Sequence, residues 1–216
     1  MALKAILFDF DGVIAETDNH HIAAWQRTLA VLGWQVADDV ASRSAEIDDR
    51  EFLTELFAKR GFNSDKIDEW VERKQLLTVG MLKNSPWLYP GVAKLLRKLR
   101  GRVRLAVVSG TCRQNIETVL EAAGLGETFE TIVGKEDVNS VKPDPEAYQL
   151  ALKRLRLSPR SSVAIEDCPT GLASARAAGL RVIAVGHRRQ FGDWVGDATY
   201  VSGLEPAEGL LRHLGL

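Results

Sequence analysis

Several features that would place a chain of 216 residues in a special class are scarce here. There are only two cysteines, Cys112 and Cys168, which lie far apart and in no metal-binding or redox spacing. We therefore expect reduced thiols and no disulfide framework. No apolar run approaches the roughly 20 residues that span a bilayer. The formal net charge is −1, which gives no electrostatic reason to expect nucleic acid or a membrane as a partner.

A secretory signal is not expected either. The N-terminal segment is apolar, but it reaches Asp9 and Asp11 too early for a signal peptide. We therefore predict a cytoplasmic protein. With 45% apolar residues, the chain can form one full core, or a core and a small inserted domain.

The first segment of the chain ends in two carboxylates. Residues 5–8 are apolar, and Asp9, Asp11 and Gly12 follow at once. A short apolar run bounded by glycine is typical of a buried strand. Two close carboxylates repel each other unless a cation neutralises them, and ligands that offer only oxygen favour Mg²⁺. Taken alone, this motif is equally consistent with a charged turn after a strand.

Three later segments also place polar side chains just beyond a strand or just before a helix. They read Val-Arg-Leu-Ala-Val-Val-Ser-Gly at 103–110, Val-Lys-Pro-Asp-Pro at 141–145 and Ser-Val-Ala-Ile-Glu-Asp at 162–167. An open α/β sheet binds its ligand at the carboxyl ends of its strands, which is where these side chains would gather. Each motif alone also fits a simpler structure: a helix N-cap, a solvated turn or an acidic turn.

The order of strands and helices predicts an α/β fold with an insertion. Helical stripes separate most of the strand signals, which implies a parallel sheet with right-handed crossovers. The exception is the stretch from about 16 to 86, which shows only helical periodicity and is far longer than a crossover needs. We therefore predict a helical domain over 16–86, inserted into a core made of 1–15 and 87–216. Strands are expected near 3–8, 103–108, 130–133, 162–166 and 181–185.

Taken in order, the motifs Asp-x-Asp, Ser, Lys and Glu-Asp resemble those of the haloacid dehalogenase superfamily. The similarity is greatest to its β-phosphoglucomutase-like and phosphoglycolate-phosphatase-like branch, and it covers nearly the whole chain. The resemblance implies a doubly wound, Rossmann-like core with an all-α cap that excludes water and recognises substrate. It also implies Mg²⁺ as cofactor and a small phosphorylated metabolite as ligand.

The same resemblance assigns roles to the core motifs. Asp9 would be the nucleophile that forms an aspartyl-phosphate, and Asp11 the general acid/base. The dehalogenases of the superfamily lack an aspartate at the place of Asp11, so its presence favours phosphoryl transfer. Ser109, Gly110 and Thr111 would bind the phosphoryl oxygens, and Lys142 would neutralise their charge. The metal site would consist of Asp9, the Asp11 carbonyl and Asp167. Glu166 would be a further ligand or would hold a metal-bound water.

Candidate substrate residues outside those motifs are Thr17, His21, Arg50, Lys74 and Arg113. Thr17 and His21 match a family pattern in which the histidine positions the acid/base. Arg50 matches an arginine that holds the substrate's second phosphate in the mutases, a role that suits a bidentate guanidinium. For Lys74 an exposed helix position is the simpler expectation, and for Arg113 a phosphate contact is one of two alternatives.

The segment before Arg50 departs from the mutase pattern. The mutases carry Lys-Gly there, whereas this chain has Glu46 and Ile47, followed by Asp48 and Asp49. We therefore predict a Mg²⁺-dependent phosphatase acting on a small phosphate monoester, with a sugar phosphate as the preferred substrate class. The alternative is a β-phosphoglucomutase-type sugar phosphomutase. A non-catalytic binding protein is disfavoured, because no core catalytic position is lost.

Overall fold

The computed structural model describes residues 2–45, 47–62 and 65–216, which divide into two compact units. The first unit comprises Met1–Glu16 and Trp87–Leu216, and the second comprises Thr17–Pro86. The division after Glu16 falls one residue beyond the expected one. Glu16 belongs with the first unit because its N–H donates to the Trp87 carbonyl at 3.2 Å and its carboxylate pairs with Arg188 at 2.7 Å.

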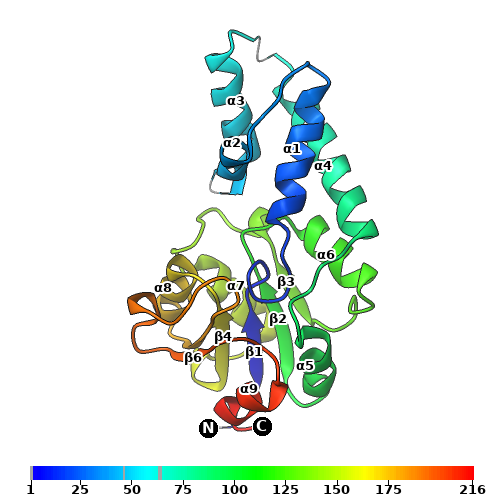
Figure 1. Ribbon diagram of the computed structural model, residues 1–216. Helices are drawn as coiled ribbons and strands as arrows, with labels where there is room; N and C mark the ends of the chain where they lie inside the picture. The colour runs from blue at the N-terminus through cyan, green and yellow to red at the C-terminus, as the bar shows by residue number, and fades with distance from the viewer. Residues whose placement is uncertain (1, 46, 63–64) are drawn as a thin grey trace. The chain divides into compact units, whose positions relative to one another are not determined.

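A six-stranded parallel sheet forms the centre of the first unit (Figure 1). The strand order is β3-β2-β1-β4-β5-β6, and every pairing is parallel. The sequence predicts five of these strands but not β6, because its three residues are only half-buried and carry no apolar run. The strands are β1 (Ala5–Phe8), β2 (Arg104–Val108), β3 (Thr131–Val133), β4 (Ser162–Glu166), β5 (Arg181–Val185) and β6 (Thr199–Val201).

Helices cover both faces of this sheet. One face packs Ala5 and Leu7 of β1 against Tyr148 and Leu172, which lie on α7 and α8. The alternate residues Ile6 and Phe8 are buried on the other face, and α5 and α6 lie on that side (Figure 1). The helices are α5 (Val92–Leu99), α6 (Arg113–Ala122), α7 (Glu146–Leu155), α8 (Pro169–Ala177) and α9 (Ala207–Leu214), with short 3₁₀ turns η2 (Lys135–Asp137), η3 (Pro159–Ser161) and η4 (Asp193–Val195).

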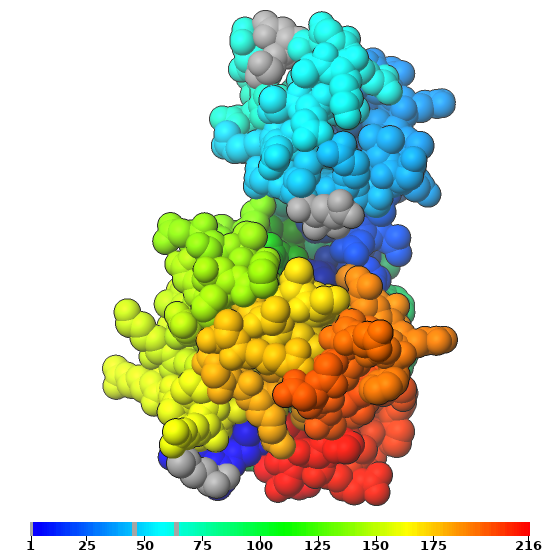
Figure 2. Space-filling model, turned by 90° about the vertical axis from the view of Figure 1, so that its left-hand side faces the viewer, coloured from blue at the N-terminus to red at the C-terminus, as the bar shows by residue number. Residues whose placement is uncertain are grey.

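The strand order creates a switch point beside β1. The chain builds β1, β2 and β3 outward in one direction, then returns to the other side of β1 to build β4, β5 and β6. Loops at the carboxyl ends of β1, β2 and β4 therefore diverge, and such a divergence leaves a crevice for ligand. The segment between β5 and β6 runs over the surface next to α8 (orange in Figure 2).

The described part of the second unit consists of helices and turns, without a strand. Its core is formed by large side chains from α1 and α3, among them Trp25, Leu29, Phe52 and Phe57, with Trp34 packed edge-on against Phe57. The helices are α1 (Asp18–Ala30), α2 (Asp38–Ser42), α3 (Asp49–Lys59) and α4 (Ile67–Asn84), with the 3₁₀ turn η1 (Arg43–Ala45). The predicted α/β core with an inserted all-α cap is confirmed, and the second unit is referred to below as the cap unit.

No helix among the described residues is both long and apolar enough to cross a bilayer.

Candidate active site

The register of the central strands places two acidic residues next to each other. Phe8 of β1 pairs with Ile165 of β4, so the residues that follow, Asp9 and Glu166, are neighbours at the carboxyl ends of the strands. The N–H of Asp9 donates to the Ile165 carbonyl at 2.9 Å, which continues the ladder one residue beyond β1. Both side chains are almost fully buried.

Lys142 joins these two carboxylates. Its Nζ donates to Asp9 Oδ1 and to Glu166 Oε1, both at 2.7 Å, and to the Val108 carbonyl at 2.9 Å. The turn that carries Lys142 is anchored by a hydrogen bond of 2.6 Å from the Ser174 hydroxyl to the Asp144 carbonyl. The lysine is therefore held between β1, β2 and β4 and does not sit in a solvated turn.

Glu166 is supported by two residues that the sequence did not identify. The Tyr148 hydroxyl donates to Glu166 Oε1, as a buried tyrosine hydroxyl requires a partner. On the opposite side, a Cβ added to Gly171 of α8 would overlap with Glu166 Oε2. Oε2 has no hydrogen-bond partner among the described residues. The helical periodicity predicts Tyr148 as a core residue of α7. The only sequence signal for its contact with Glu166 is that tyrosine carries a hydroxyl.

Asp167 completes the acidic group. It lies at the end of β4, is buried, and packs against Gly12 in the loop after β1. Gly12 has a φ of +86°, and a Cβ there would overlap with Asp167 Oδ2. Glycine is thus required both by the left-handed backbone and by the close approach of the carboxylate.

These carboxylates carry more negative charge than Lys142 can balance. Burial and the neighbouring charge of Asp9 raise the pKa of Glu166 to about 8 and the pKa of Asp167 to about 7. Burial would lower the pKa of Lys142, but Asp9 and Glu166 outweigh it and raise that pKa well above its usual value. The lysine is therefore a permanent cation within a group that still favours a further positive charge.

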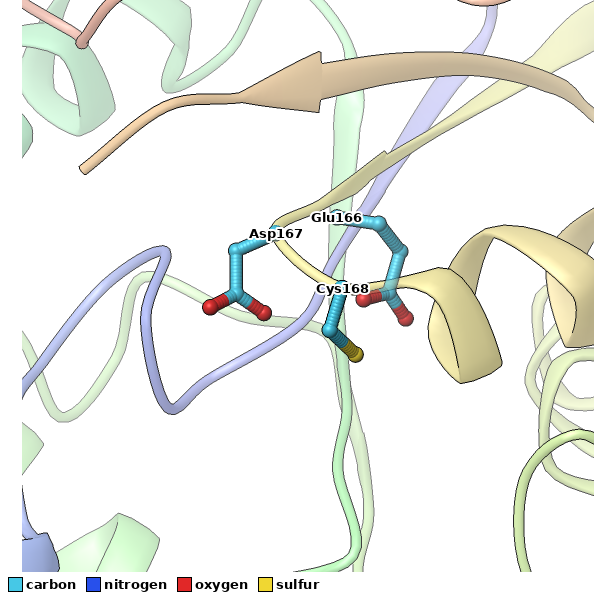
Figure 3. A group of neighbouring side chains, drawn as sticks. All are labelled: Glu166, Asp167 and Cys168. Carbon is cyan, nitrogen blue, oxygen red and sulfur yellow. The ribbon is translucent and has the colours of Figure 1, made fainter. Parts of the chain in front are cut away.

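Cys168 lies within the same group as Glu166 and Asp167. Three potential ligand atoms lie within 4.8 Å of one another, one each from Glu166, Asp167 and Cys168. In Figure 3 the Asp167 carboxylate faces the loop after β1, while the Glu166 carboxylate points toward α8. Burial, together with Glu166 and Asp9, raises the pKa of the Cys168 thiol to about 11, so the thiol is protonated at neutral pH. The oxygen donors therefore suit a hard cation.

The segment after β2 positions Asp11. The Thr111 hydroxyl donates to an Asp11 carboxylate oxygen, and the Thr111 N–H donates to Ser109 Oγ at 3.0 Å. Ser109 follows β2 and is buried, whereas Gly110 is exposed with no atom within 4 Å of an added Cβ. The structure thus brings Thr111 to Asp11, links Ser109 to Thr111, and leaves open space at Gly110.

Arg113 contacts neighbouring groups of the first unit, and its role as a phosphate ligand stays a prediction. Its guanidinium pairs with Asp137 at 2.5 Å and donates to the Ile132 carbonyl at 2.6 Å. Asp137 also forms an ion pair with Arg154, so these groups make up an ion-pair cluster beside β3. The Arg113 N–H, at the start of α6, donates to the Glu136 carboxylate at 3.1 Å. The contacts described for Arg113 are thus to neighbouring acids and to a backbone carbonyl.

In the cap unit, the position of Lys74 differs from the expected one. Lys74 is fully buried, not exposed; its Nζ contacts Asp49 at 2.8 Å and His21 Nδ1 at 2.8 Å. Thr17 is buried at the start of α1, and its carbonyl accepts from the His21 N–H. The sequence could not show this burial, because it depends on packing between three helices.

Arg50 is exposed and forms an ion pair with the equally exposed Asp68. Such exposed ion pairs contribute little to the stability of a protein, so the Arg50 guanidinium can exchange Asp68 for another anion. Of the acids expected near Arg50, Asp48 and Asp49 lie at the start of α3, and Glu46 lies outside the described residues.

Comparison with known proteins identifies the family of the chain. The family model of the haloacid dehalogenase-like hydrolases matches residues 6–185, and the chain belongs to that family. The resemblance to its β-phosphoglucomutase-like and phosphoglycolate-phosphatase-like branch is confirmed. So is the prediction of a phosphoric monoester hydrolase.

Three relatives illustrate the range of similarity. Protein CbbY of Rhodobacter capsulatus is 35% identical over 193 residues, which are 85% of each chain. The phosphorylated carbohydrates phosphatase of Thermotoga maritima is 28% identical, over 95% of this chain and 96% of its own. The crystal structure of a mutant of CbbY from Rhodobacter sphaeroides, in complex with xylulose-(1,5)bisphosphate, matches with a TM-score of 0.80 at 29% identity. That match covers 94% of this chain and 96% of the other.

The contact between Gly171 and Glu166 generates a first prediction. Gly171→Ala should displace the Glu166 carboxylate and with it Lys142, lowering the rate of phosphate release and destabilising the fold by about 1–3 kcal/mol. Gly209→Ala is the control, because an added Cβ in α9 meets no atom within 4 Å. That variant should keep its activity and gain up to about 1 kcal/mol. Urea unfolding and a phosphate-release assay on both variants measure this; equal stability and activity would contradict the contact.

Proposed function

We propose that this protein is a Mg²⁺-dependent phosphatase that hydrolyses a small sugar phosphate through an aspartyl-phosphate intermediate. The observation that carries the proposal is the bond of 2.7 Å between Lys142 Nζ and Asp9 Oδ1 at the switch point of the sheet. A nucleophile that must approach a phosphate dianion needs a fixed cation beside it. Glu166 accepts from the same ammonium group at 2.7 Å and so helps to hold it in place.

The residues present fit a magnesium ion. Buried oxygens crowd the carboxyl ends of β1 and β4, the pKa values of Glu166 and Asp167 are raised, and Glu166 Oε2 lacks a partner among the described residues. Asp9, Asp167 and the Asp11 carbonyl would hold the ion, and Glu166 would bind it or a water on it. When bound, Mg²⁺ would supply charge neutralisation for the phosphoryl group.

Each step of the proposed reaction is assigned to a residue of the chain. The Asp9 carboxylate attacks phosphorus, a new O–P bond forms, and the bond to the leaving alkoxide breaks. Asp11 donates its proton to that leaving oxygen and later accepts a proton from the water that cleaves the aspartyl-phosphate. Thr111 orients Asp11 through its hydroxyl, while Ser109, the Gly110 segment and Lys142 bind the phosphoryl oxygens.

The proposed substrate class rests on the relatives. The Thermotoga maritima relative is a phosphorylated carbohydrates phosphatase, and the Rhodobacter sphaeroides CbbY mutant was crystallised with a sugar bisphosphate. The alternative, a sugar phosphomutase, shares every core residue and differs in which nucleophile attacks the aspartyl-phosphate. A mutase must also hold a second phosphate. Of the two cap cations predicted to contact substrate, Arg50 is exposed and Lys74 is buried, which favours the phosphatase.

Removing the nucleophile should abolish turnover. Asp9→Asn keeps the size of the side chain but removes the attacking charge, and the variant should release no phosphate above background. Asp11→Asn should lower the rate of phosphate release by about 10²–10⁴-fold, the usual contribution of general acid/base catalysis. Asp193→Asn, an exposed aspartate on η4, is the control and should retain full activity. Initial rates with a sugar monophosphate panel measure all three, and near-normal turnover by Asp9→Asn would refute the assignment.

Metal removal should have an equally large effect. Treatment with EDTA should stop phosphate release, and an excess of Mg²⁺ should restore it. Ca²⁺ should restore it poorly, because it prefers more ligands and a looser geometry. EDTA saturated with Mg²⁺ beforehand is the control for effects of the chelator itself. Undiminished turnover after exhaustive chelation would exclude the metal site.

A third experiment separates the phosphatase from the mutase. β-Glucose 1-phosphate, primed with glucose 1,6-bisphosphate, should yield inorganic phosphate and little glucose 6-phosphate. Arg50→Ala should raise KM for substrates with a second anionic group more than for simple monoesters. Coupling to glucose-6-phosphate dehydrogenase detects the mutase product, and robust NADPH formation would favour the mutase.

A further inference from the structure

The loop of residues 10–16, which carries Asp11, ends where the chain leaves the first unit. β1 precedes this loop, and on its far side the chain passes into the cap unit at Thr17. Backbone hydrogen bonds close the loop on itself: the Ala15 N–H donates to the Phe10 carbonyl at 3.0 Å, and the Gly12 N–H donates to the Ala15 carbonyl at 2.9 Å. Ala15 is thus bonded to the residues on both sides of Asp11.

Glu16 fixes the far end of this loop within the first unit. Its carboxylate accepts two hydrogen bonds from Arg188, from Nε at 2.8 Å and from an Nη at 2.7 Å, and a third from the Tyr89 hydroxyl at 2.7 Å. The side chains of Arg188 and Glu16 are only 27% and 21% exposed, and a bidentate pair with such geometry is stronger than an ordinary surface pair. The Tyr89 N–H also donates to the Ile14 carbonyl at 3.0 Å, so the tyrosine binds the loop at two points.

The segment after β5 packs against the same tyrosine. The His187 and Tyr89 rings are stacked, with their centres 4.1 Å apart and 8° between their planes, and Arg188 Nε also donates to the Tyr89 hydroxyl at 3.1 Å. Burial lowers the pKa of His187 to about 4, so the stacked imidazole is neutral at neutral pH. Burial and the bond to Glu16 raise the pKa of Tyr89 well above its usual value, so its hydroxyl keeps the proton that it donates. The segments that follow β1 and β5 are therefore joined through Tyr89.

We propose that Arg188 is a positioning residue for the general acid/base Asp11, and that it acts through Glu16 and the loop of residues 10–16. The inference rests on the proposed function, in which Asp11 donates a proton to the leaving oxygen. The Thr111 hydroxyl holds the Asp11 carboxylate directly, and the Arg188–Glu16 pair fixes the backbone of the loop that carries Asp11. The sequence shows no sign of this pair, because 172 residues separate its two members.

The test compares two aryl phosphates whose leaving groups differ in their need for a proton. Phenolate is a basic leaving group that benefits from a general acid, whereas p-nitrophenolate leaves without a proton. For each ester kcat/KM covers the steps up to the aspartyl-phosphate, and any loss of folded protein cancels in the ratio of phenyl to p-nitrophenyl phosphate. Arg188→Met should lower this ratio by about tenfold, since a displacement of about 1 Å can cost up to about a hundredfold. An unchanged ratio would overturn the proposal.

Arg189→Met is the matched control for the loss of a positive charge. Arg189 is the next residue along the chain and is exposed, and its backbone carbonyl accepts from the Tyr200 hydroxyl at 3.3 Å. The charges of Arg188 and Arg189 both oppose the rise in the pKa of Asp167, so the two variants disturb that carboxylate in the same direction. Arg189→Met should leave the ratio unchanged. An equal fall with both variants would show an effect of charge alone and would contradict the positioning role.

A double variant tests whether Arg188 acts through Glu16. Glu16→Gln keeps the length of the side chain but removes the charge that pairs with Arg188, so it should lower the same ratio. Arg188→Met combined with Glu16→Gln should lower the ratio no further than Arg188→Met alone, because both changes break one interaction. Losses that multiply in the double variant would mean that the two residues act independently, which the proposal excludes.

Tyr89→Phe keeps the proposal testable if the charge variants fail to fold. It retains the ring that stacks on His187 and removes only the hydroxyl that donates to Glu16. The ratio should fall by about two- to fivefold, the scale of one hydrogen bond, and no fall would count against the proposal.

Asp11→Asn separates failure of this inference from failure of the proposed function. It should lower the ratio by more than Arg188→Met does, because it removes the acid itself. A fall with Asp11→Asn but none with Arg188→Met would overturn the inference and leave the proposed function intact. An unchanged ratio with Asp11→Asn, or wild-type protein that releases phosphate from neither ester, would overturn the proposed role of Asp11 and the inference with it.

Discussion

The first unit depends on an electrostatic conflict at the carboxyl ends of β1 and β4. Parallel pairing fixes Asp9 and Glu166 side by side, and Asp167 follows one residue later. Three buried carboxylates in such a small volume are stable only with compensating positive charge. Lys142 supplies one charge and bonds to two of the three carboxylates. The other residues of the site fix the positions of Lys142 and of the carboxylates.

Small residues and anchored turns provide that support. Gly12 and Gly171 allow the Asp167 and Glu166 carboxylates to approach backbone where any Cβ would collide. Ser174 fastens the turn that carries Lys142, and the Tyr148 hydroxyl shares Glu166 with the lysine. Because these contacts come from different loops and helices, the geometry of the nucleophile depends on the packing of the whole unit.

The sequence predicts those parts of the molecule that depend on local patterns. Five strands and the helical insertion follow from apolar runs and helical stripes, and the order of the core motifs indicates where the site lies. The edge strand β6 is not predicted because its residues lie at a half-buried sheet edge, where the apolar run that marks a buried strand is absent. The surroundings of Lys74 and Arg113 are not predictable for a different reason: their partners, Asp49 and Asp137, lie 25 and 24 residues away and are identified only by tertiary packing.

The two units solve the problem of a buried lysine in opposite ways. In the first unit, Lys142 faces more carboxylates than it can neutralise, and the surplus negative charge creates a demand for a cation that can in turn meet a phosphate. In the cap unit, the Lys74 ammonium bonds among the described residues to the Asp49 carboxylate and the His21 imidazole, so that one positive charge faces one negative charge. The same ammonium–carboxylate bond thus leaves a surplus of carboxylates in one place and a one-to-one pair in the other. The number of carboxylates around each lysine decides whether a further ion is attracted, because only an unbalanced group of charges gains free energy by binding another ion.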